Sequence, residues 1–467
     1  MTATVTLPDL LEKQLQRQAI AYRLRPLHEA GPPSQRAEVC LLADDEGMLL
    51  TLIPADHLLD LRQLERMTQR PLQPLRDKTL QGILSRFQLT YLPGLPMLVE
   101  APCMIEQRLL EQPRIWMPSG LPGWCLELDQ QALAHLASSA STTAAAFAVP
   151  LSSIAHSAEA PAQDQQDIST AVQNFTALRM RQRLEETLEI PPLPNTAQRI
   201  MALRVNPDTT VEQLTDVVET DPSLAAQVVS WASSSFYAAP GKIRSVEDAI
   251  VRVLGFDLVM NLSIGLSLGK TFSLPKDAPE RTTPYWEQSI YTAAIIEGLA
   301  KAMPRDLRPE LGLNYLAGLL HNFGYLVLAY IFPPYFQLIC RHMEANPHVP
   351  AWLVDQHLLG VNRDQIGSWL MRYWDMPLEI STAIRHQHDP DYQGEHHEYA
   401  NLIYLSLALL RERDLGNGPL MEVPDSLLER LQLGREDADK VVNKVLDARD
   451  ALRKLVNDYQ LGFSRQG

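Results

Sequence analysis

The stretch that decides the fold runs from Ile190 to Leu268 and reads IPPLPNTAQRIMALRVNPDTTVEQLTDVVETDPSLAAQVVSWASSSFYAAPGKIRSVEDAIVRVLGFDLVMNLSIGLSL. Apolar residues recur in it at i, i+3, i+4 and i+7, which is the spacing of one face of an α-helix. Successive helices separated by short breaks are therefore expected at 195–205, 210–220, 223–234 and 246–255.

Residues that favour helix ends stand at these breaks. Asp208-Thr209-Thr210 precedes one expected helix and Asp221-Pro222-Ser223 the next, so side-chain acceptors and a proline fall where a helix begins. Gly255 stands where a left-handed cap would end the helix over 246–255. The breaks thus agree with the periodicity.

The helical pattern continues to the end of the chain. Further helices are expected at 285–303, 314–332, 363–374, 377–388 and 436–460. The last of these begins with acids and grows more basic, which suits the helix dipole. We expect it to pack on the helical bundle, although pairing with a second copy of the chain is the alternative.

The first 135 residues have a different pattern of apolar residues and turn signals. Two apolar runs within 37–55 flank an Asp-Asp-Glu-Gly break, the pattern of a strand, a turn and a second strand. Strands are also expected in LPMLVEAPCMI and WCLELD, and helices in LLDLRQLERM and LQGILSRF. The prediction is a multidomain protein with an N-terminal α/β domain, built on a mixed sheet with helices, and a C-terminal all-α helical bundle.

Residues 136–172 are rich in Ala, Ser and Thr and carry few large apolar side chains. Such a segment buries too little surface to offset the entropy of ordering it, so a flexible linker is expected. The predicted organisation is a domain over 1–135, this linker, a helical domain over 173–410 and a helical extension over 411–467.

The bulk composition excludes several classes of protein. The formal net charge is −15, so non-specific binding of nucleic acid is disfavoured. The four cysteines form no C-x-x-C pair, which argues against zinc ribbons and redox motifs. No apolar stretch predicts a signal peptide or a membrane span. A cytoplasmic location without a membrane contact is expected.

The decisive stretch contains Pro192-Leu193-Pro194, the Asp221-Pro222 turn and the block ending at Gly255. Through these features it resembles the start of HDOD domains. The resemblance continues through LAGLLHNFGYLVL to AIRHQHDP and covers about half of the chain. HDOD domains are helical relatives of the HD metal phosphohydrolases. The resemblance implies an output or adaptor module in bacterial signalling that acts on a protein partner.

The metal ligands that an HD phosphohydrolase needs are not at the matching positions. Such enzymes use imidazoles and a carboxylate to hold metals that activate water. Gln288 stands where the first His is expected, His321-Asn322 replaces the His-Asp pair, and Arg363 replaces a later His. Asn is a poor bridging ligand and a guanidinium repels a cation. The resemblance therefore implies no metal, no cofactor and no catalytic residue.

His386 and His388 remain, and two interpretations of this vestigial HD pocket stay open. In one, His321 is a core histidine that bonds Asn322 or a backbone carbonyl. In the other, the pocket binds a small anion or a nucleotide through His321, Arg363, Arg385 and His386. The candidate residues are Gln288, His321, Asn322, Arg363, Arg385, His386 and His388.

Three features of the first domain resemble one enzyme family. They are Pro54-Ala55-Asp56, the helix after Asp60, and Ser119-Gly120 before a late strand. The family is that of the YbaK-like aminoacyl-tRNA deacylases, which edit mischarged tRNA. That class uses a lysine near the start of the first strand pair, where Glu38 stands here. A carboxylate would repel the RNA 3′ end. The candidate pocket is Glu38, Ser119 and Gly120, and the domain is expected to be degenerate.

Three functions follow from these features. The first is a non-enzymatic signalling protein whose HDOD domain binds a protein partner, with apolar candidates in YIFPPYFQL. The alternative is an aminoacyl-tRNA deacylase regulated by the HDOD domain, with tRNA as its one nucleic-acid partner. The third, a divergent metal-dependent phosphodiesterase, is opposed by the missing ligands.

Overall fold

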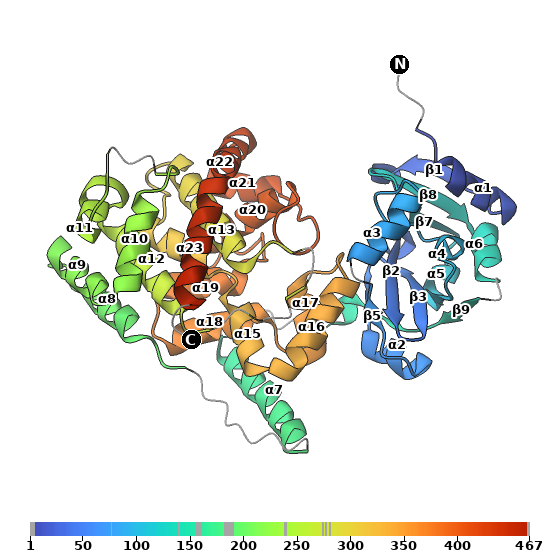
Figure 1. Ribbon diagram of the computed structural model, residues 1–467, viewed down its shortest axis with the longest axis horizontal. Helices are drawn as coiled ribbons and strands as arrows, with labels where there is room; N and C mark the ends of the chain where they lie inside the picture. Colours follow the sequence, from blue (N-terminus) through green and yellow to red (C-terminus); the bar gives the residue numbers. More distant parts are fainter. Residues whose placement is uncertain are drawn as a thin grey trace. The chain divides into compact units, whose positions relative to one another are not determined.

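The computed structural model describes residues 5–75, 77–138, 141–154, 161–181, 191–237, 241–272, 275, 278–279 and 282–464 (Figure 1). The chain divides into two compact units. Unit 1 holds the chain up to position 156 together with residues 337–358 and the short piece 277–280. Unit 2 holds the remainder, which is helical in its described part. The expected fold, an N-terminal α/β region and a C-terminal all-helical region, is confirmed.

The described residues of unit 1 form three sheets. The largest has the strand order β5-β2-β3-β6-β9, in which β2 pairs antiparallel with β3 and β5, while β6 runs parallel to β3 and β9. The others have the orders β1-β8-β7 and β10-β4. The strands are β1 Arg23–Pro26, β2 Ala37–Asp44, β3 Gly47–Pro54, β4 His57–Leu59, β5 Gln73–Pro74, β6 Cys103–Glu106, β7 Arg114–Pro118, β8 Trp124–Asp129, β9 Thr142–Ala145 and β10 Ala148–Pro150.

The strand β3 shows why this sheet forms. Leu50 and Leu52 lie in one buried cluster, and Leu49 and Ile53 in another. Successive side chains of a strand point to opposite faces, so β3 is covered on both sides. The predicted hairpin over 37–55 is confirmed as β2 and β3.

Short helices surround these sheets. They are α1 Asp9–Arg17, η1 Leu27–Glu29, η2 Pro33–Gln35, α2 Leu61–Thr68, α3 Asp77–Arg86, α4 Pro96–Val99, α5 Gln107–Leu110, α6 Gln130–Ala137 and η3 Leu151–Ser153. Both predicted helices, in α2 and α3, are present. LPMLVEAPCMI, predicted as one strand, instead forms α4 and then β6.

The structure differs from the predicted flexible linker over 136–172. The strand β9 pairs with β6, β10 pairs with β4, and α7 spans Pro161–Arg181. The edge of an existing sheet supplies hydrogen bonds to the backbone, so small side chains suffice there. Positions 139–140 and 155–160 of the predicted linker lie outside the described residues.

Unit 2 is a bundle in which α12, α13, α14 and α20 are buried along most of their length. Its helices are α7 Pro161–Arg181, α8 Asn195–Val205, α9 Val211–Glu219, α10 Pro222–Ala232, α11 Val246–Ala249, η4 Ile250–Leu254, α12 Phe256–Gly269, α13 Tyr285–Ala302, α14 Leu311–Leu320, α15 Phe323–Ile331, α18 Arg363–Tyr373, α19 Leu378–His386, α20 His397–Arg411, α21 Asp425–Leu431, α22 Arg435–Asp447 and α23 Arg449–Ser464. Helices α16 Pro333–Ala345 and α17 Ala351–Leu359 lie mainly in unit 1.

The predicted helix starts are confirmed. Thr210 caps α9 in a capping box with Gln213, and Asp221 accepts hydrogen bonds from the first turn of α10. Gly255 has a positive φ of 83° but an extended ψ of 166°, so it is not the left-handed cap that the sequence suggested. It instead joins η4 directly to α12.

Two predicted helices are broken in the structure. The helix over 314–332 divides into α14 and α15, and the helix over 436–460 divides into α22 and α23. Both halves of the second contact the bundle, since α22 and α23 pack against α13, and α23 also packs against α10 (Figure 1). The expectation that this region packs on the bundle is therefore confirmed.

Candidate functional site

His321 stands at the break between α14 and α15, where it is 2% exposed. Its Nδ1–H donates to the carbonyl of Gly318 at 2.7 Å. The Nε2 lone pair is then left to accept from the Gln288 amide at 3.3 Å. Burial lowers the pKa of His321 to about 4, against a smaller opposing effect of the Gly318 carbonyl. The ring is therefore a neutral acceptor at ordinary pH.

The same centre contains a carboxylate that the sequence analysis missed. Asp364 is buried, and its Oδ2 lies 2.7 Å from Nδ1 of His388. The Gln387 amide donates both to Asp364 Oδ1 at 2.8 Å and to the backbone carbonyl of His321 at 2.9 Å. Asp364 thus joins α18 and α19 to the end of α14. The sequence feature that could have identified Asp364 is its position in the first turn of α18, two residues after the cap Asn362.

The other predicted residues have separate partners. Arg385 donates to Asp164 of α7, and Arg363 lies over the ring of Tyr325 at 5.5 Å. His386 stacks on Tyr392 with 3.8 Å between ring centroids. Burial and the adjacent Arg385 lower the pKa of His386. Asn322 is the N-cap residue of α15 and makes no side-chain cap bond.

The structure thus brings together Gln288, His321 and, through Asp364, His388. Within the described residues, no three His, Cys, Asp or Glu side chains converge as metal ligands would. Several polar atoms at this centre are nevertheless buried without a hydrogen-bond partner, namely Gln288 Oε1, Gln387 Oε1 and Arg411 Nε. Burial lowers the pKa of Arg411 to about 10. The centre is a polar interior closed mainly by its own hydrogen bonds.

In unit 1, Ser119 is fully buried and closes the turn between β7 and β8. Its hydroxyl donates to the carbonyl of Trp124 at 2.7 Å and accepts from the N–H of Leu121 at 3.2 Å. Gly120 has a φ of 85°, and a Cβ there would lie 2.7 Å from a Leu89 methyl group. Glu38 is half-buried on β2, opposite Ile53 of β3. Ser119 and Gly120 therefore have a turn-forming role, and their role in a deacylase-like pocket stays a prediction.

Comparison with known proteins agrees with both resemblances. An HDOD domain model matches residues 190–390, and an aminoacyl-tRNA editing domain model matches residues 29–136. A Marinobacter aquaeolei VT8 protein to which a role in signal transduction has been ascribed is 40% identical, with a TM-score of 0.88 over 97% of this chain and 100% of that one.

This chain is an HDOD domain protein. An HDOD domain protein of unknown function from Geobacter sulfurreducens shares the fold at 21% identity, with a TM-score of 0.50 over 61% of this chain and 97% of that one. An uncharacterized protein of Treponema pallidum (strain Nichols) is 24% identical over 262 residues, which are 56% of this chain and 49% of that protein. The match thus spans about half the length of that curated relative.

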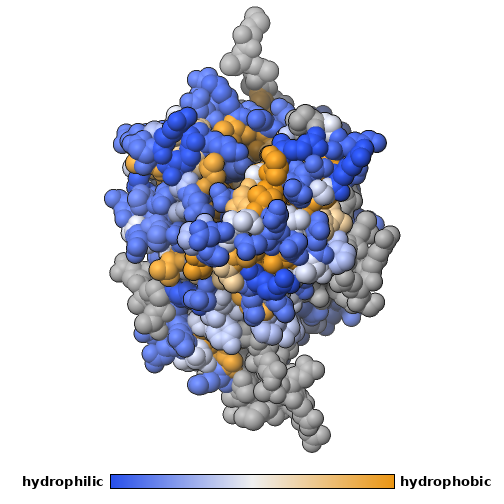
Figure 2. Space-filling model, turned by 90° about the vertical axis from the view of Figure 1, so that its left-hand side faces the viewer, coloured by the Kyte–Doolittle hydropathy of each residue, from blue (hydrophilic) through white to orange (hydrophobic). Residues whose placement is uncertain are grey.

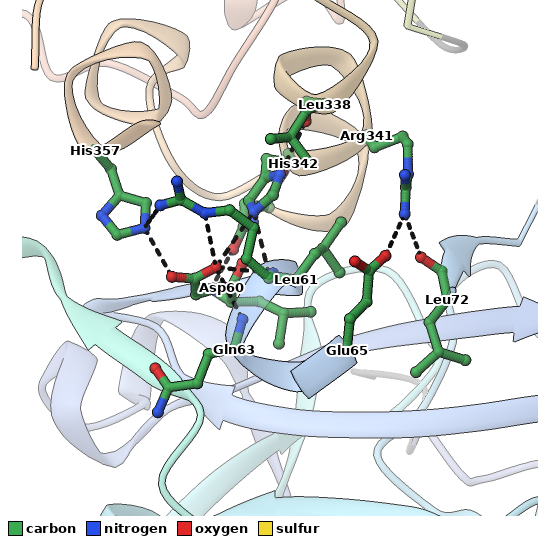
Figure 3. A network of polar contacts seen from close by, with 12 residues as sticks. Asp60, Leu61, Gln63, Glu65, Leu72, Leu338, Arg341, His342 and His357 are labelled. Carbon is green, nitrogen blue, oxygen red and sulfur yellow. Dashed lines mark hydrogen bonds and ion pairs between the residues drawn. The ribbon is translucent and has the colours of Figure 1, made fainter. Parts of the chain in front are cut away.

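The HDOD protein also contains a set of contacts that the sequence analysis did not foresee (Figure 3). We call the contacts of Leu59, Asp60 and Leu61 with His342, Asn346 and His357 the α2–α16 junction. The N–H of Leu59 donates to Oδ1 of Asn346 at 2.6 Å, and Nδ2 of Asn346 donates back to the Leu59 carbonyl at 3.0 Å. The buried carboxamide therefore pairs with the backbone as a neighbouring strand would.

His342 occupies the next position of the junction and is fully buried. Its Nδ1–H donates to the carbonyl of Leu338 at 2.8 Å, so Nε2 accepts from the N–H of Leu61 at 3.2 Å. Leu61 is the first residue of α2, where the backbone N–H has no partner within the helix. The His342 side chain of α16 thus accepts a hydrogen bond from the first backbone N–H of α2.

Asp60 completes the junction as the N-cap of α2. Its Oδ1 accepts from the N–H of Arg62 at 2.9 Å, and its Oδ2 lies 3.1 Å from Nε2 of His357. Burial opposes ionisation, but the His357 ring and the Arg62 guanidinium lower the pKa of Asp60. Asp60 is therefore an ionised acceptor at the centre of the junction in Figure 3.

The junction lies within unit 1 and joins residues 337–358 to the rest of that unit. Arg341 adds a 2.6 Å ion pair with Glu65 and a hydrogen bond to the Leu72 carbonyl, and Ala345 lies in the buried cluster under α2. Residues 337–358 fall inside the HDOD match at 190–390, yet they form one compact unit with the editing domain. Apolar periodicity could not indicate these contacts, because they join segments about 280 positions apart.

Proposed function

We propose that this HDOD protein is a signal-transduction protein that binds a protein partner and does not hydrolyse a phosphodiester. The observation that carries the proposal is the residue set at the HD-like centre. Gln288 and Asn322 stand at expected ligand positions, and the Asp364 carboxylate already pairs with Gln387 and His388. An amide cannot replace an anionic bridging ligand for a divalent metal.

Phosphodiester hydrolysis with added Mn²⁺ tests the catalytic half of this proposal. We expect the wild-type chain to turn over no faster than Asp364→Asn, which removes a buried carboxylate of the centre. Turnover by the wild type that Asp364→Asn abolishes would contradict the proposal.

The partner surface that we favour is a groove in unit 2, with a volume of about 550 Å³. Helix α8 and the turn between α18 and α19 form most of it, with Val205 85% and Leu378 58% exposed. Exposed apolar side chains beside a groove are typical of protein-binding surfaces. The YIFPPYFQL run is a poorer candidate than the sequence suggested, since Phe332 and Phe336 are buried.

Figure 2 shows one face of the molecule, on which apolar side chains form separate patches among hydrophilic ones. An isolated exposed apolar residue is therefore not distinctive, and the test needs a matched control. Val205→Glu should abolish capture of the partner by the full chain, whereas Leu420→Glu should not. Leu420 is 73% exposed and does not line the groove. Equal capture by both variants would exclude the groove.

Aminoacyl-tRNA deacylation is the second candidate, which the match to an editing domain favours. Glu38 at the expected lysine position opposes it, because two anions repel. The test is release of amino acid from mischarged tRNA. Turnover that is lost in Glu38→Gln would make editing the function of this domain.

A further inference from the structure

A carboxylate of α7 is buried against α18 and α19. Asp164 is 0% exposed and accepts from Arg385, from Nε to Oδ2 at 2.8 Å and from Nη2 to Oδ1 at 3.1 Å. The Gln365 amide donates to Oδ1 at 2.9 Å. Nη2 of Arg372 lies 3.7 Å from Oδ2. Two guanidinium groups and an amide therefore surround one carboxylate.

In the part of the chain that the structure describes, this group contains two guanidinium groups and the single carboxylate of Asp164. Nη2 of Arg372 is buried and has no hydrogen-bond partner, so the carboxylate leaves one donor unused. A tetrahedral dianion offers more acceptor oxygens and a second negative charge, and arginine forks bind such anions well. Inorganic phosphate would therefore satisfy more of these donors than the Asp164 carboxylate does.

The carboxylate and the donors come from different parts of the chain. Gln365, Arg372 and Arg385 lie in the HDOD match, whereas Asp164 precedes it. Beyond Asp164, the residues of α7 that are buried in its described part are Ile168 and Ala171, at 3% and 4% exposure. Over residues 163–173, helix α7 therefore contacts the bundle through one narrow face. Asp164 is the buried acid on that face.

We propose that Arg385, Arg372 and Gln365 form a binding site for a phosphate group, which Asp164 of α7 occupies as an internal ligand. Phosphate binding then displaces the carboxylate and frees α7 from α18. The site does not depend on the partner binding proposed above, because the groove and this group share no residue. Failure of partner capture would leave the phosphate site untouched.

The test uses the full chain and inorganic phosphate, with sodium chloride at matched ionic strength as the salt control. We expect Asp164→Ala to bind phosphate saturably and at least ~10-fold more tightly than the wild type, because no internal ligand competes. Its thermal midpoint should fall without phosphate and recover as phosphate is added. Asp167→Ala, which removes an acid on the same helix, should behave as the wild type.

Two further measurements keep the proposal falsifiable. Asp164→Asn keeps the shape of the side chain, and it replaces Asp164→Ala if that variant does not fold. Adding Arg385→Ala should abolish the phosphate response. In the wild type, saturating phosphate should raise amide exchange over residues 163–173. A phosphate response no larger than that of chloride, or one that survives Arg385→Ala, would overturn the site, and unchanged exchange would overturn the displacement.

Discussion

At the scale of single residues, the burial of His321 makes the stability of the folded chain depend on pH. Its pKa is about 4 in the folded chain, against an ordinary value of about 6.5. The unfolded chain therefore binds a proton between these two values that the folded chain does not, so stability falls as the pH falls from 6.5 to 4. The expected loss over this window is on the order of 3 kcal/mol.

Urea unfolding at pH 7.5 and pH 5 measures the part of this loss that falls above pH 5, about 2 kcal/mol. His321→Gln cannot titrate, so its stability should fall less between the two pH values than that of the wild type. His28→Gln, which changes an exposed histidine, should keep the wild-type slope. Equal slopes for His321→Gln and the wild type would show that His321 is not responsible.

The candidate residues could be predicted only in part from sequence. Gln288 and His321 were identified by their positions in a resemblance, and they do lie in contact. Asp364 was overlooked because it interacts with His388, 24 positions away, across two helices whose relative rotation the sequence does not specify. Arg385 was assigned to a pocket, but its guanidinium donates to Asp164 in a segment predicted to be flexible.

At the scale of elements, the helix predicted over 314–332 breaks because α15 must approach α18 closely. A Cβ on Gly324 would lie 1.9 Å from the backbone oxygen of Arg363. Apolar periodicity continues through the break, so the pattern alone could not reveal it. The same limit applies to α22 and α23, which the sequence presented as one amphipathic helix.

This close approach predicts that Gly324→Ala is strongly destabilising. The obstructing atoms belong to the backbone and cannot rotate away, so α15 and α18 must separate, at a cost of at least about 2 kcal/mol. Chemical denaturation measures the change. Gly82→Ala is the control, since a Cβ there meets nothing within 4 Å. It should be neutral or stabilising, because Ala favours a helix more than Gly does. A small effect of Gly324→Ala would mean that the helices can move apart freely.

The α2–α16 junction gives a second prediction at this scale. Asn346→Ala leaves both the N–H and the carbonyl of Leu59 without their partner in a buried setting. We expect a loss of about 3 kcal/mol, since each unpaired buried group costs about 1–3 kcal/mol. The measurement is the free energy of unfolding. Gln81→Ala, an exposed change on α3 of the same unit, should cost less than about 0.5 kcal/mol. A similar cost for both variants would show that water replaces the Asn346 amide.

At the scale of the whole molecule, the two family matches do not correspond to two separately folded halves. The sequence predicts an editing-like domain, a linker and a helical domain in order along the chain. In the structure, residues 337–358 form one compact unit with the editing domain, and part of the predicted linker forms the strands β9 and β10. Such contacts over long sequence distances have no local signal, because composition and periodicity describe neighbours along the chain.

This arrangement predicts how the isolated editing domain behaves. A fragment of residues 1–156 lacks Ala345, which lies in the buried cluster under α2, and the junction partners of Leu59, Asp60 and Leu61. It should therefore expose apolar surface, bind a hydrophobic dye and unfold at a lower temperature than unit 1 does in the full chain. A peptide of residues 337–358, added in trans, should raise that temperature and reduce dye binding, whereas the same peptide with Asn346→Ala and His342→Ala should not. A fragment that is as stable as the full chain, or that responds equally to both peptides, would mean that α16 and α17 only rest on a domain that is already complete.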